Sequence, residues 1–137
     1  MENLLISGKK DTPIVEFNAD ELVFRISGNS IVDDAKTFYT PIINWLKSYS
    51  TNASSLLKFE FNFSEISQPT LKMLLYLFQE IKSMQIDGKS ISVVWGVPFL
   101  NNLIKEIGQD VSYMSDVKFK FETFTEVIEQ SEGLELV

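Results

Sequence analysis

The stretch from Leu57 to Phe63 alternates strictly between apolar and polar side chains, which limits the folds open to this chain. In an extended strand one face carries Leu57, Phe59, Phe61 and Phe63, and the other carries Lys58, Glu60 and Asn62. A strand covered by helices on both faces would instead be an unbroken apolar run. The pattern therefore predicts a sheet with helices on one face and solvent on the other.

The same period of two recurs elsewhere in the chain. Leu22, Phe24 and Ile26 alternate with Val23, Arg25 and Ser27, and Val117, Phe119 and Phe121 alternate with Lys118, Lys120 and Glu122. Ile91, Val93 and Trp95 share one face of a further strand over residues 90–95. Short strands are also expected at residues 4–6 and 14–17, so the sheet has several members.

Three segments between these strands carry helical patterns. One runs from Asp33-Asp34 to about Tyr49, with its apolar residues three or four positions apart and Pro41 inside, which predicts a kink or a split first turn. The second runs from about Pro69 to Met84, with Leu71, Leu74, Leu75, Phe78 and Ile81 facing inward. The third runs from Phe99 to Ile107 and is expected to end at Gly108.

Together these elements predict an α/β fold of two layers, a mixed β-sheet with helices packed on one face, and not a doubly wound fold. The length of the chain, 137 residues, suits a single domain. We place that domain at residues 1–122. Residues 123–137 are acidic and lack a strong pattern, so they are expected to form an acidic C-terminal tail or a short helix.

The composition excludes several classes of function. The chain has no histidine and no cysteine, so the common catalytic triads and zinc sites cannot be built, and no metal or cofactor is expected. A net charge of -7 makes nucleic acid an unfavourable partner. The first residues do not resemble a secretory signal, and no apolar run suits membrane insertion, so we expect a cytoplasmic protein.

The junction between the alternating strand and the second helix carries the most information about function. Ser67 or Gln68 would cap the helix, and Pro69 suits its first turn. On this segment alone, an ordinary capped helix is the favoured interpretation. The alternative is a signalling loop, because a phosphate at this point would meet unpaired amides and the positive end of the helix dipole.

The order and spacing of several short motifs resemble those of SiaC-type regulatory phosphoproteins. The motifs are Met1-Glu2-Asn3-Leu4 with Gly8 and Thr12-Pro13, Ile26 to Ser30, Phe38-Tyr39-Thr40-Pro41 with Asn44-Trp45-Leu46, and Gly88 leading to Val93-Val94-Trp95. The resemblance extends to about Trp95 and then weakens. It implies a fold similar to the STAS domains of anti-sigma-factor antagonists.

The resemblance also implies a function. Members of this family are non-enzymatic partner-switch proteins controlled by a serine/threonine kinase and a metal-dependent phosphatase. In the best-understood system the unphosphorylated protein binds and activates a diguanylate cyclase. The resemblance therefore implies a signalling protein that regulates a partner, such as a diguanylate cyclase, as a monomer or weak dimer.

The phosphate-acceptor position departs from the family pattern. The family usually carries Asn-Thr-Ser-Ser at this junction, with the phosphate on the threonine, whereas this chain reads Ser67-Gln68-Pro69-Thr70. Because glutamine cannot be phosphorylated, either Ser67 or Thr70 has taken over the role or the switch has been lost. The neighbouring residues expected to contact a partner are Ser64, Glu65, Pro69 and Lys72.

A second departure follows Trp95, where relatives tend to have an acidic loop. Here the chain reads Gly96-Val97-Pro98-Phe99-Leu100, which we interpret as core in preference to an altered partner surface. Asp33-Asp34 is interpreted as helix capping in preference to catalysis. Lys58, Lys118 and Lys120 are interpreted as solubilising charge in preference to an anion site.

Two further functions remain open. One is a phosphorylation-independent adaptor or dimeric scaffold on the same fold. The other, and the weakest, is a small enzyme or ligand-binding domain that relies on carboxylates and tyrosine.

Overall fold

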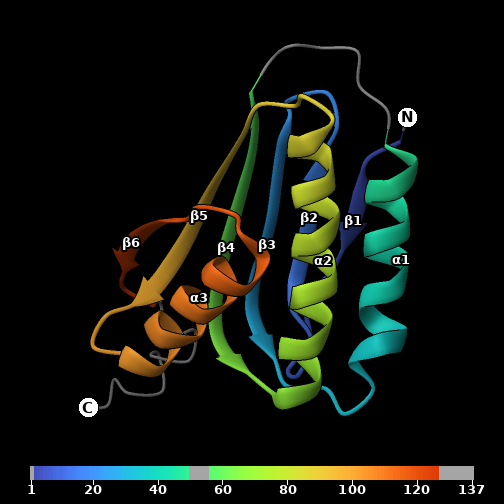
Figure 1. Cartoon of the computed structure of the whole chain (residues 1–137). Helices are drawn as coiled ribbons and strands as arrows, with labels where there is room; N and C mark the ends of the chain where they lie inside the picture. Colours follow the sequence, from blue (N-terminus) through green and yellow to red (C-terminus); the bar gives the residue numbers. More distant parts are fainter. Residues whose placement is uncertain (1, 50–55, 127–137) are drawn as a thin grey trace.

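The computed structural model describes residues 2–49 and 56–126, which form one sheet and three helices (Figure 1). The strands are β1 (Leu4–Ile6), β2 (Ile14–Asn18), β3 (Val23–Ser30), β4 (Leu57–Ile66), β5 (Ile91–Pro98) and β6 (Lys120–Phe124). The helices are α1 (Ala35–Ser48), α2 (Gln68–Ile86) and α3 (Asn102–Ser115). Every predicted strand and helix is present; β1 has the predicted ends, and the other elements have shifted ends.

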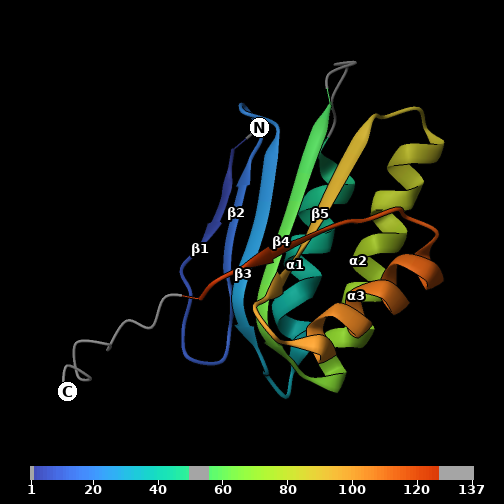
Figure 2. The ribbon, with the colours of Figure 1, turned by 90° about the vertical axis from the view of Figure 1, so that its left-hand side faces the viewer.

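The strands lie in the order β1-β2-β3-β4-β5-β6. β1, β2 and β3 pair antiparallel, whereas β3, β4, β5 and β6 pair parallel, each through an intervening helix. All three helices cover the same face of the sheet (Figure 2). The predicted two-layer fold with a mixed sheet is therefore confirmed. None of the helices formed by the described residues has the length and hydrophobicity that a membrane span needs.

The alternation in β4 places its aromatic side chains in the core. Phe59, Phe61 and Phe63 are at most 1% exposed, whereas Lys58 is exposed and the side chains of Glu60 and Asn62 are half-buried. The ring of Phe61 packs against Phe78 of α2, with centroids 4.9 Å apart, and against Trp95 of β5. The predicted strand register is confirmed.

Charged side chains on the solvent face of the sheet form local pairs. Arg25 Nε donates to Glu60 Oε1 at 2.8 Å, a contact that raises the pKa of Arg25, and Lys120 lies 3.5 Å from Glu122. Two of the basic residues on this face therefore already lie beside a carboxylate. For Lys120 the contact favours solubilising charge, whereas for Lys58 and Lys118 that interpretation stays a prediction.

The predicted end of the third helix at Gly108 is wrong. α3 continues through Gly108 to Ser115 and ends at Asp116, which adopts a left-handed conformation with φ of 58°. A Cβ atom at position 108 would collide with Nε1 of Trp95. The same indole Nε1 donates to the carbonyl of Ile104 at 3.0 Å, so the glycine allows the helix to pack closely on the ring.

α1 runs unbroken from Ala35 to Ser48 through Pro41, so of the two predicted effects of this proline the splitting of the first turn is excluded, and a kink stays a prediction. One detail of α2 differs from expectation. The buried face of α2 includes Met73 and Leu77, whereas Leu71 and Leu75 are only partly buried. This shift follows from tertiary packing, because α2 lies between α1 and α3 as well as on the sheet (Figure 1).

The segment after Trp95 divides into a buried and an exposed part. Val97 and Pro98 are buried in β5, as expected, but Phe99 and Leu100 are 64% and 83% exposed, so the core interpretation is wrong for these two residues. A turn closed by the Asn101 amide and the Pro98 carbonyl, at 2.9 Å, carries them past the end of the strand. Leu100 has a positive φ of 65° in this turn.

The predicted C-terminal segment is described only at its beginning. β6 extends to Phe124, two residues beyond the predicted domain end, and residues 127–137 lie outside the described part. The tail or short helix expected at residues 123–137 therefore remains a prediction beyond the strand. The implied similarity to STAS domains also remains a prediction.

Candidate functional site

Ser67 is the one residue between the end of β4 and the start of α2. It has extended backbone angles, and its hydroxyl oxygen accepts a hydrogen bond from the Thr70 amide at 3.3 Å. Of the two predicted caps, the structure therefore uses Ser67, while Gln68 is the first helical residue. Pro69 follows in the first turn, where a missing N–H costs nothing because that amide has no partner within the helix.

Thr70 belongs to a buried chain of hydroxyl groups that joins three elements. Its Oγ1 donates to the carbonyl oxygen of Ser30 at 2.9 Å and also lies 2.9 Å from Ser30 Oγ. Ser30 Oγ in turn lies 2.7 Å from the hydroxyl of Tyr39, and Ser67 Oγ lies 3.1 Å from Thr70 Oγ1. Through these contacts the end of β3 is tied to both α1 and α2.

The carbonyl acceptor determines the direction of the hydrogen bonds in this chain. Because the Thr70 hydroxyl donates its one proton to the Ser30 carbonyl, Thr70 Oγ1 accepts from Ser30 Oγ. Ser30 Oγ then accepts from the hydroxyl of Tyr39. Each hydroxyl then donates once, and no buried side-chain polar atom of the described residues lacks a partner. Burial raises the pKa of Tyr39 far above its usual range, because the tyrosinate would lose its hydration.

The structure separates the predicted junction residues by accessibility. Thr70 is 0% exposed, so its hydroxyl is closed to a modifying enzyme in this conformation, whereas Ser67 is half-buried. Gln68 is exposed, although it has no hydroxyl group. Of the predicted partner-contacting residues, Glu65, Pro69 and Lys72 are exposed, whereas Ser64 is half-buried.

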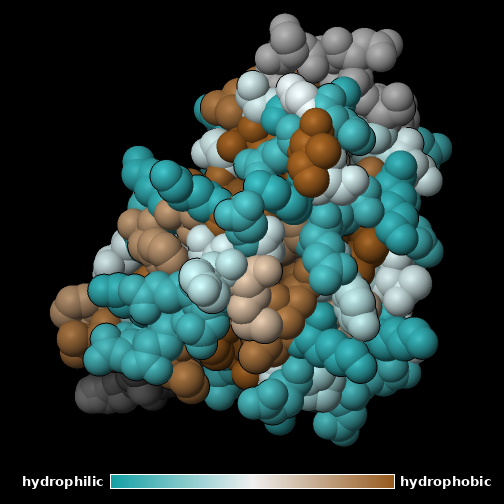
Figure 3. Space-filling view, viewed as in Figure 1, coloured by the Kyte–Doolittle hydropathy of each residue, from teal (hydrophilic) through white to brown (hydrophobic). Residues whose placement is uncertain are grey.

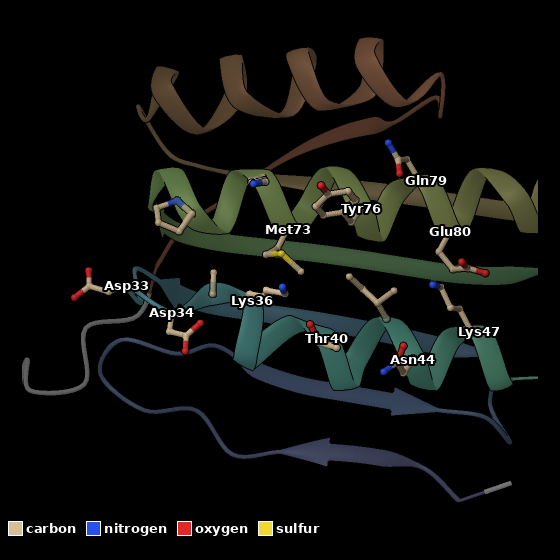
Figure 4. Close-up of a pocket in the computed structure, with 14 residues that line it drawn as sticks. Asp33, Asp34, Lys36, Thr40, Asn44, Lys47, Met73, Tyr76, Gln79 and Glu80 are labelled. Atoms are coloured by element: carbon tan, nitrogen blue, oxygen red, sulfur yellow. The ribbon is translucent and has the colours of Figure 1, made fainter.

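A groove of about 520 Å³ runs between α1 and α2 and begins beside this junction (Figure 4). Pro69 and Lys72 line it, whereas Ser64 and Glu65 do not. The α1 side contributes Asp33, Asp34, Ala35, Lys36, Thr40, Ile43, Asn44 and Lys47, and the α2 side adds Met73, Tyr76, Gln79 and Glu80. The structure thus brings half of the predicted contact residues into one surface feature.

The groove and the buried hydroxyl chain were both missed from the sequence. Lys36, Thr40, Asn44 and Lys47 follow a helical spacing beside the apolar stripe of α1, a signal that indicates only a polar helix flank. Ser30 and Tyr39 belong to two of the motifs that carry the family resemblance, but these motifs do not imply that the two residues are in contact. Both features depend on which segments pack together.

The interpretation of Asp34 as a helix cap is confirmed. Its Oδ1 accepts from the Thr37 amide at 3.2 Å, and the Thr37 hydroxyl donates to Oδ2 at 2.7 Å. The hydroxyl bond, then the amide bond, lowers the pKa of Asp34 because both stabilise the carboxylate. Within residues 2–49 and 56–126, no three carboxylates come together where a metal ion could bind.

Comparison with known proteins identifies the family of this chain. Residues 6–125 match the model of the SiaC family of regulatory phosphoproteins. The match continues well past Trp95, where the resemblance of the sequence motifs weakens. No significant relative is found among curated proteins.

Solved structures with the same fold come from Pseudomonas aeruginosa. SiaC from this organism superposes with a TM-score of 0.77 at 15% identity, covering 92% of this chain and 100% of its own. A structure described as the diguanylate cyclase SiaD in complex with its activator SiaC matches with a TM-score of 0.79 at 14% identity. That match covers 88% of this chain and 99% of the solved one.

The family match spans most of the described residues, including the β4–α2 junction and both walls of the groove. The family consists of regulatory phosphoproteins, so the expectation of a non-enzymatic signalling protein is confirmed. This chain belongs to the SiaC family of regulatory phosphoproteins.

Proposed function

We propose that this protein regulates a partner enzyme by direct binding, under the control of a serine/threonine kinase and a metal-dependent phosphatase. A diguanylate cyclase is the partner class best supported, because a structure with the same fold is described as the activator SiaC bound to the cyclase SiaD. We further propose that the protein acts in the cytoplasm, as a monomer or weak dimer, and that its phosphate acceptor is Ser67.

The position of Ser67 is the observation that carries this proposal. Ser67 directly precedes Gln68, the position that corresponds to the acceptor threonine in the family pattern. It is the cap of α2 and is only half-buried, whereas the hydroxyl of Thr70 is fully enclosed and donates to the Ser30 carbonyl. Accessibility therefore favours Ser67 over Thr70 as the acceptor.

A phosphate on Ser67 changes the junction in two ways. The hydroxyl proton is lost, so Ser67 can no longer donate to Thr70 Oγ1, which lies 3.1 Å away. The phosphate also adds about -1.5 to -2 charges at neutral pH, and phosphate oxygens accept well from the free amides at a helix start. The start of α2, where Pro69 and Lys72 line the groove, is then either displaced or exposed to the added negative charge.

The proposal is tested by mass spectrometry of the protein purified from its own host without phosphatase treatment. We expect phosphate on Ser67 in at least one growth condition, and none on Thr70. The Ser67→Ala variant should lose the phosphate, while Ser64→Ala, a neighbouring serine on the same strand-to-helix segment, should retain it. Phosphate on Thr70 alone would show that Thr70 is the acceptor and that the assignment to Ser67 is wrong.

The exposed Gln68 favours a second candidate, an adaptor that binds its partner permanently. Glutamine holds no phosphate, so such a protein would stay in its partner-competent state. Absence of phosphate under all conditions, together with phosphorylation of a Gln68→Thr variant by the host kinase, would support this adaptor. If alanine at Ser67, Gln68 and Thr70 together leaves partner binding unchanged in a folded protein, the junction is only a helix cap.

A further inference from the structure

β6 forms one edge of the sheet, and none of the other described strands pairs with its outer side. It is last in the strand order, with β5 as its neighbour, and it lies nearest the viewer in Figure 2. The carbonyl of Phe124 accepts from the amide of Phe99, directly after β5, at 2.8 Å, so the backbone groups of Phe124 face β5. Because these groups alternate along a strand, those of Phe121 and Thr123 face outward, where a further strand can pair with them.

The core holds β6 in place at both of its ends. Directly before the strand, the ring of Phe119 packs against Phe78 of α2 and stacks on Trp95 of β5, with centroids 4.8 Å and 5.6 Å apart. At the end of the strand, a Cβ atom at Gly96 would lie 3.0 Å from the ring of Phe124, so the glycine leaves room for this ring on the sheet. The edge is therefore already ordered, and pairing with it costs little further conformational entropy.

The charges of β6 are complementary to those of the same strand in the opposite direction. Lys120 and Glu122 lie on the solvent face with 73% and 54% of their side chains exposed. When two β6 strands pair antiparallel about Phe121, Lys120 of each copy lies directly opposite Glu122 of the other. Phe121 then forms a hydrogen-bonded pair with its own equivalent, and the charged residues form the closer, non-hydrogen-bonded pairs.

The two neighbouring registers of such a pair are unfavourable. One places Lys120 opposite Lys120 of the other copy, and the other places Glu122 opposite its equivalent. Like charges directly opposite each other destabilise a sheet. The register about Phe121 instead forms two opposite-charge pairs, because every contact of a two-fold interface occurs twice.

The surroundings of β6 suit a reversible contact. The left side of the molecule, where β6 lies in Figure 1, shows hydrophilic residues beside hydrophobic ones in Figure 3. Interfaces that form and dissociate have this mixed composition. α1 lies on the opposite side of the helix layer, so a contact through β6 leaves α1 uncovered (Figure 1).

We propose that β6 is the interface of a homodimer, in which two copies of this chain pair antiparallel with Phe121 at the two-fold axis. The two sheets join into one, with both helix layers on the same face. Because β6 has only five residues, the dimer is weak and reversible. This interface goes beyond the proposed function, which allows a monomer or a weak dimer, and the regulation of a partner does not depend on it.

Sedimentation equilibrium of the purified full-length chain tests this interface. Between about 1 µM and about 1 mM, the range in which a weak dimer dissociates, we expect a monomer–dimer equilibrium. Lys120→Glu should raise the Kd of the dimer at least about tenfold, because two-fold symmetry turns both cross-strand pairs into Glu–Glu pairs. Lys58→Glu makes the same change in net charge at an exposed position on β4 and should leave the Kd nearly unchanged.

Exchange of the two charges provides a second, independent readout. Lys120→Glu/Glu122→Lys restores opposite charges across the two-fold axis, so this variant should dimerise like the original protein. A mixture of the Lys120→Glu and Glu122→Lys variants should form heterodimers, although each variant alone stays largely monomeric. These recoveries require the register about Phe121.

Four outcomes would overturn the interface and leave the proposed function intact. A protein that stays monomeric over the whole range would leave this edge to a strand of another protein. Oligomers larger than a dimer would indicate head-to-tail pairing of β6 with β1. Equal weakening by Lys120→Glu and Lys58→Glu would show that net charge controls association. Stronger association of Lys120→Glu would show that Lys120 protects the edge from pairing.

Discussion

The hydroxyl of Thr70 donates to the carbonyl oxygen of Ser30 at 2.9 Å, joining the first turn of α2 to the end of β3 across 40 residues of sequence. The amide of Ser67 donates to the same carbonyl, also at 2.9 Å. The candidate regulatory junction is therefore anchored to the core through Ser67 before Gln68 and Thr70 two residues after it. A change at Ser67 acts on a segment that the buried hydroxyl chain holds in place.

Removing the Thr70 hydroxyl is expected to destabilise the protein. Thr70→Val keeps the side-chain shape but leaves Ser30 without one of its buried partners, which costs about 1–3 kcal/mol. Urea unfolding of the variant measures the loss. Thr123→Val, at an exposed position on β6, serves as the matched control and should be near neutral. Equal stabilities of the two variants would contradict the role given to the hydroxyl chain.

Stability should fall at alkaline pH because of Tyr39. Burial raises the pKa of this phenol above its usual value of 10.0, so in the folded protein it keeps its proton where the unfolded chain loses it. The unfolded state then binds fewer protons, and the free energy of unfolding decreases as pH rises above about 10. Unfolding measured between about pH 8 and about pH 11 should show a smaller loss in Tyr39→Phe. Tyr113→Phe, at an exposed tyrosine, should behave like the original protein.

Adding a methyl group at Gly108 is expected to disturb the packing of α3. The new Cβ in Gly108→Ala would meet the fully buried ring of Trp95 at less than 3 Å, and overpacking of a core costs about 1–3 kcal/mol. This cost should exceed the gain of about 1 kcal/mol in helix propensity. Denaturant unfolding followed by tryptophan fluorescence measures the net effect. Gln109→Ala, exposed on the same helix, should not lower stability.

Phe61 is expected to be a major contributor to core stability. Phe61→Ala removes a fully buried ring that contacts both Phe78 and Trp95, at a cost of about 3–5 kcal/mol. Lys58→Ala on the opposite face of β4 should change the free energy of unfolding by less than about 0.5 kcal/mol. A small effect at Phe61 would mean that the strand register is displaced by one residue.

Relieving the left-handed backbone at Leu100 should stabilise the protein. Asparagine tolerates a positive φ better than leucine, so Leu100→Asn is expected to gain about 0.5–1 kcal/mol while removing an exposed apolar side chain. The midpoint of thermal unfolding reports this change. Leu103→Asn, also exposed but within α3, should instead lose stability because asparagine is a weaker helix former.

Local sequence pattern determined the fold layers and the helix start. The alternation through Phe59, Phe61 and Phe63 was enough to predict a sheet with one covered face, because side chains in a strand alternate regardless of what packs on them. Ser67 before Pro69 was enough to predict a capped helix, since capping involves residues within one turn. The absence of histidine and cysteine excluded the common metal and nucleophile sites without any structure.

The tertiary structure alone decided the features that join distant segments. Gly108 reads as a helix end until Trp95 is seen to occupy the space of its missing side chain. Phe99 and Leu100 resemble core until a turn carries them off the end of β5. The contact of Thr70 with Ser30, and the groove between α1 and α2, have no local signature, because they depend on how segments far apart in the chain pack together.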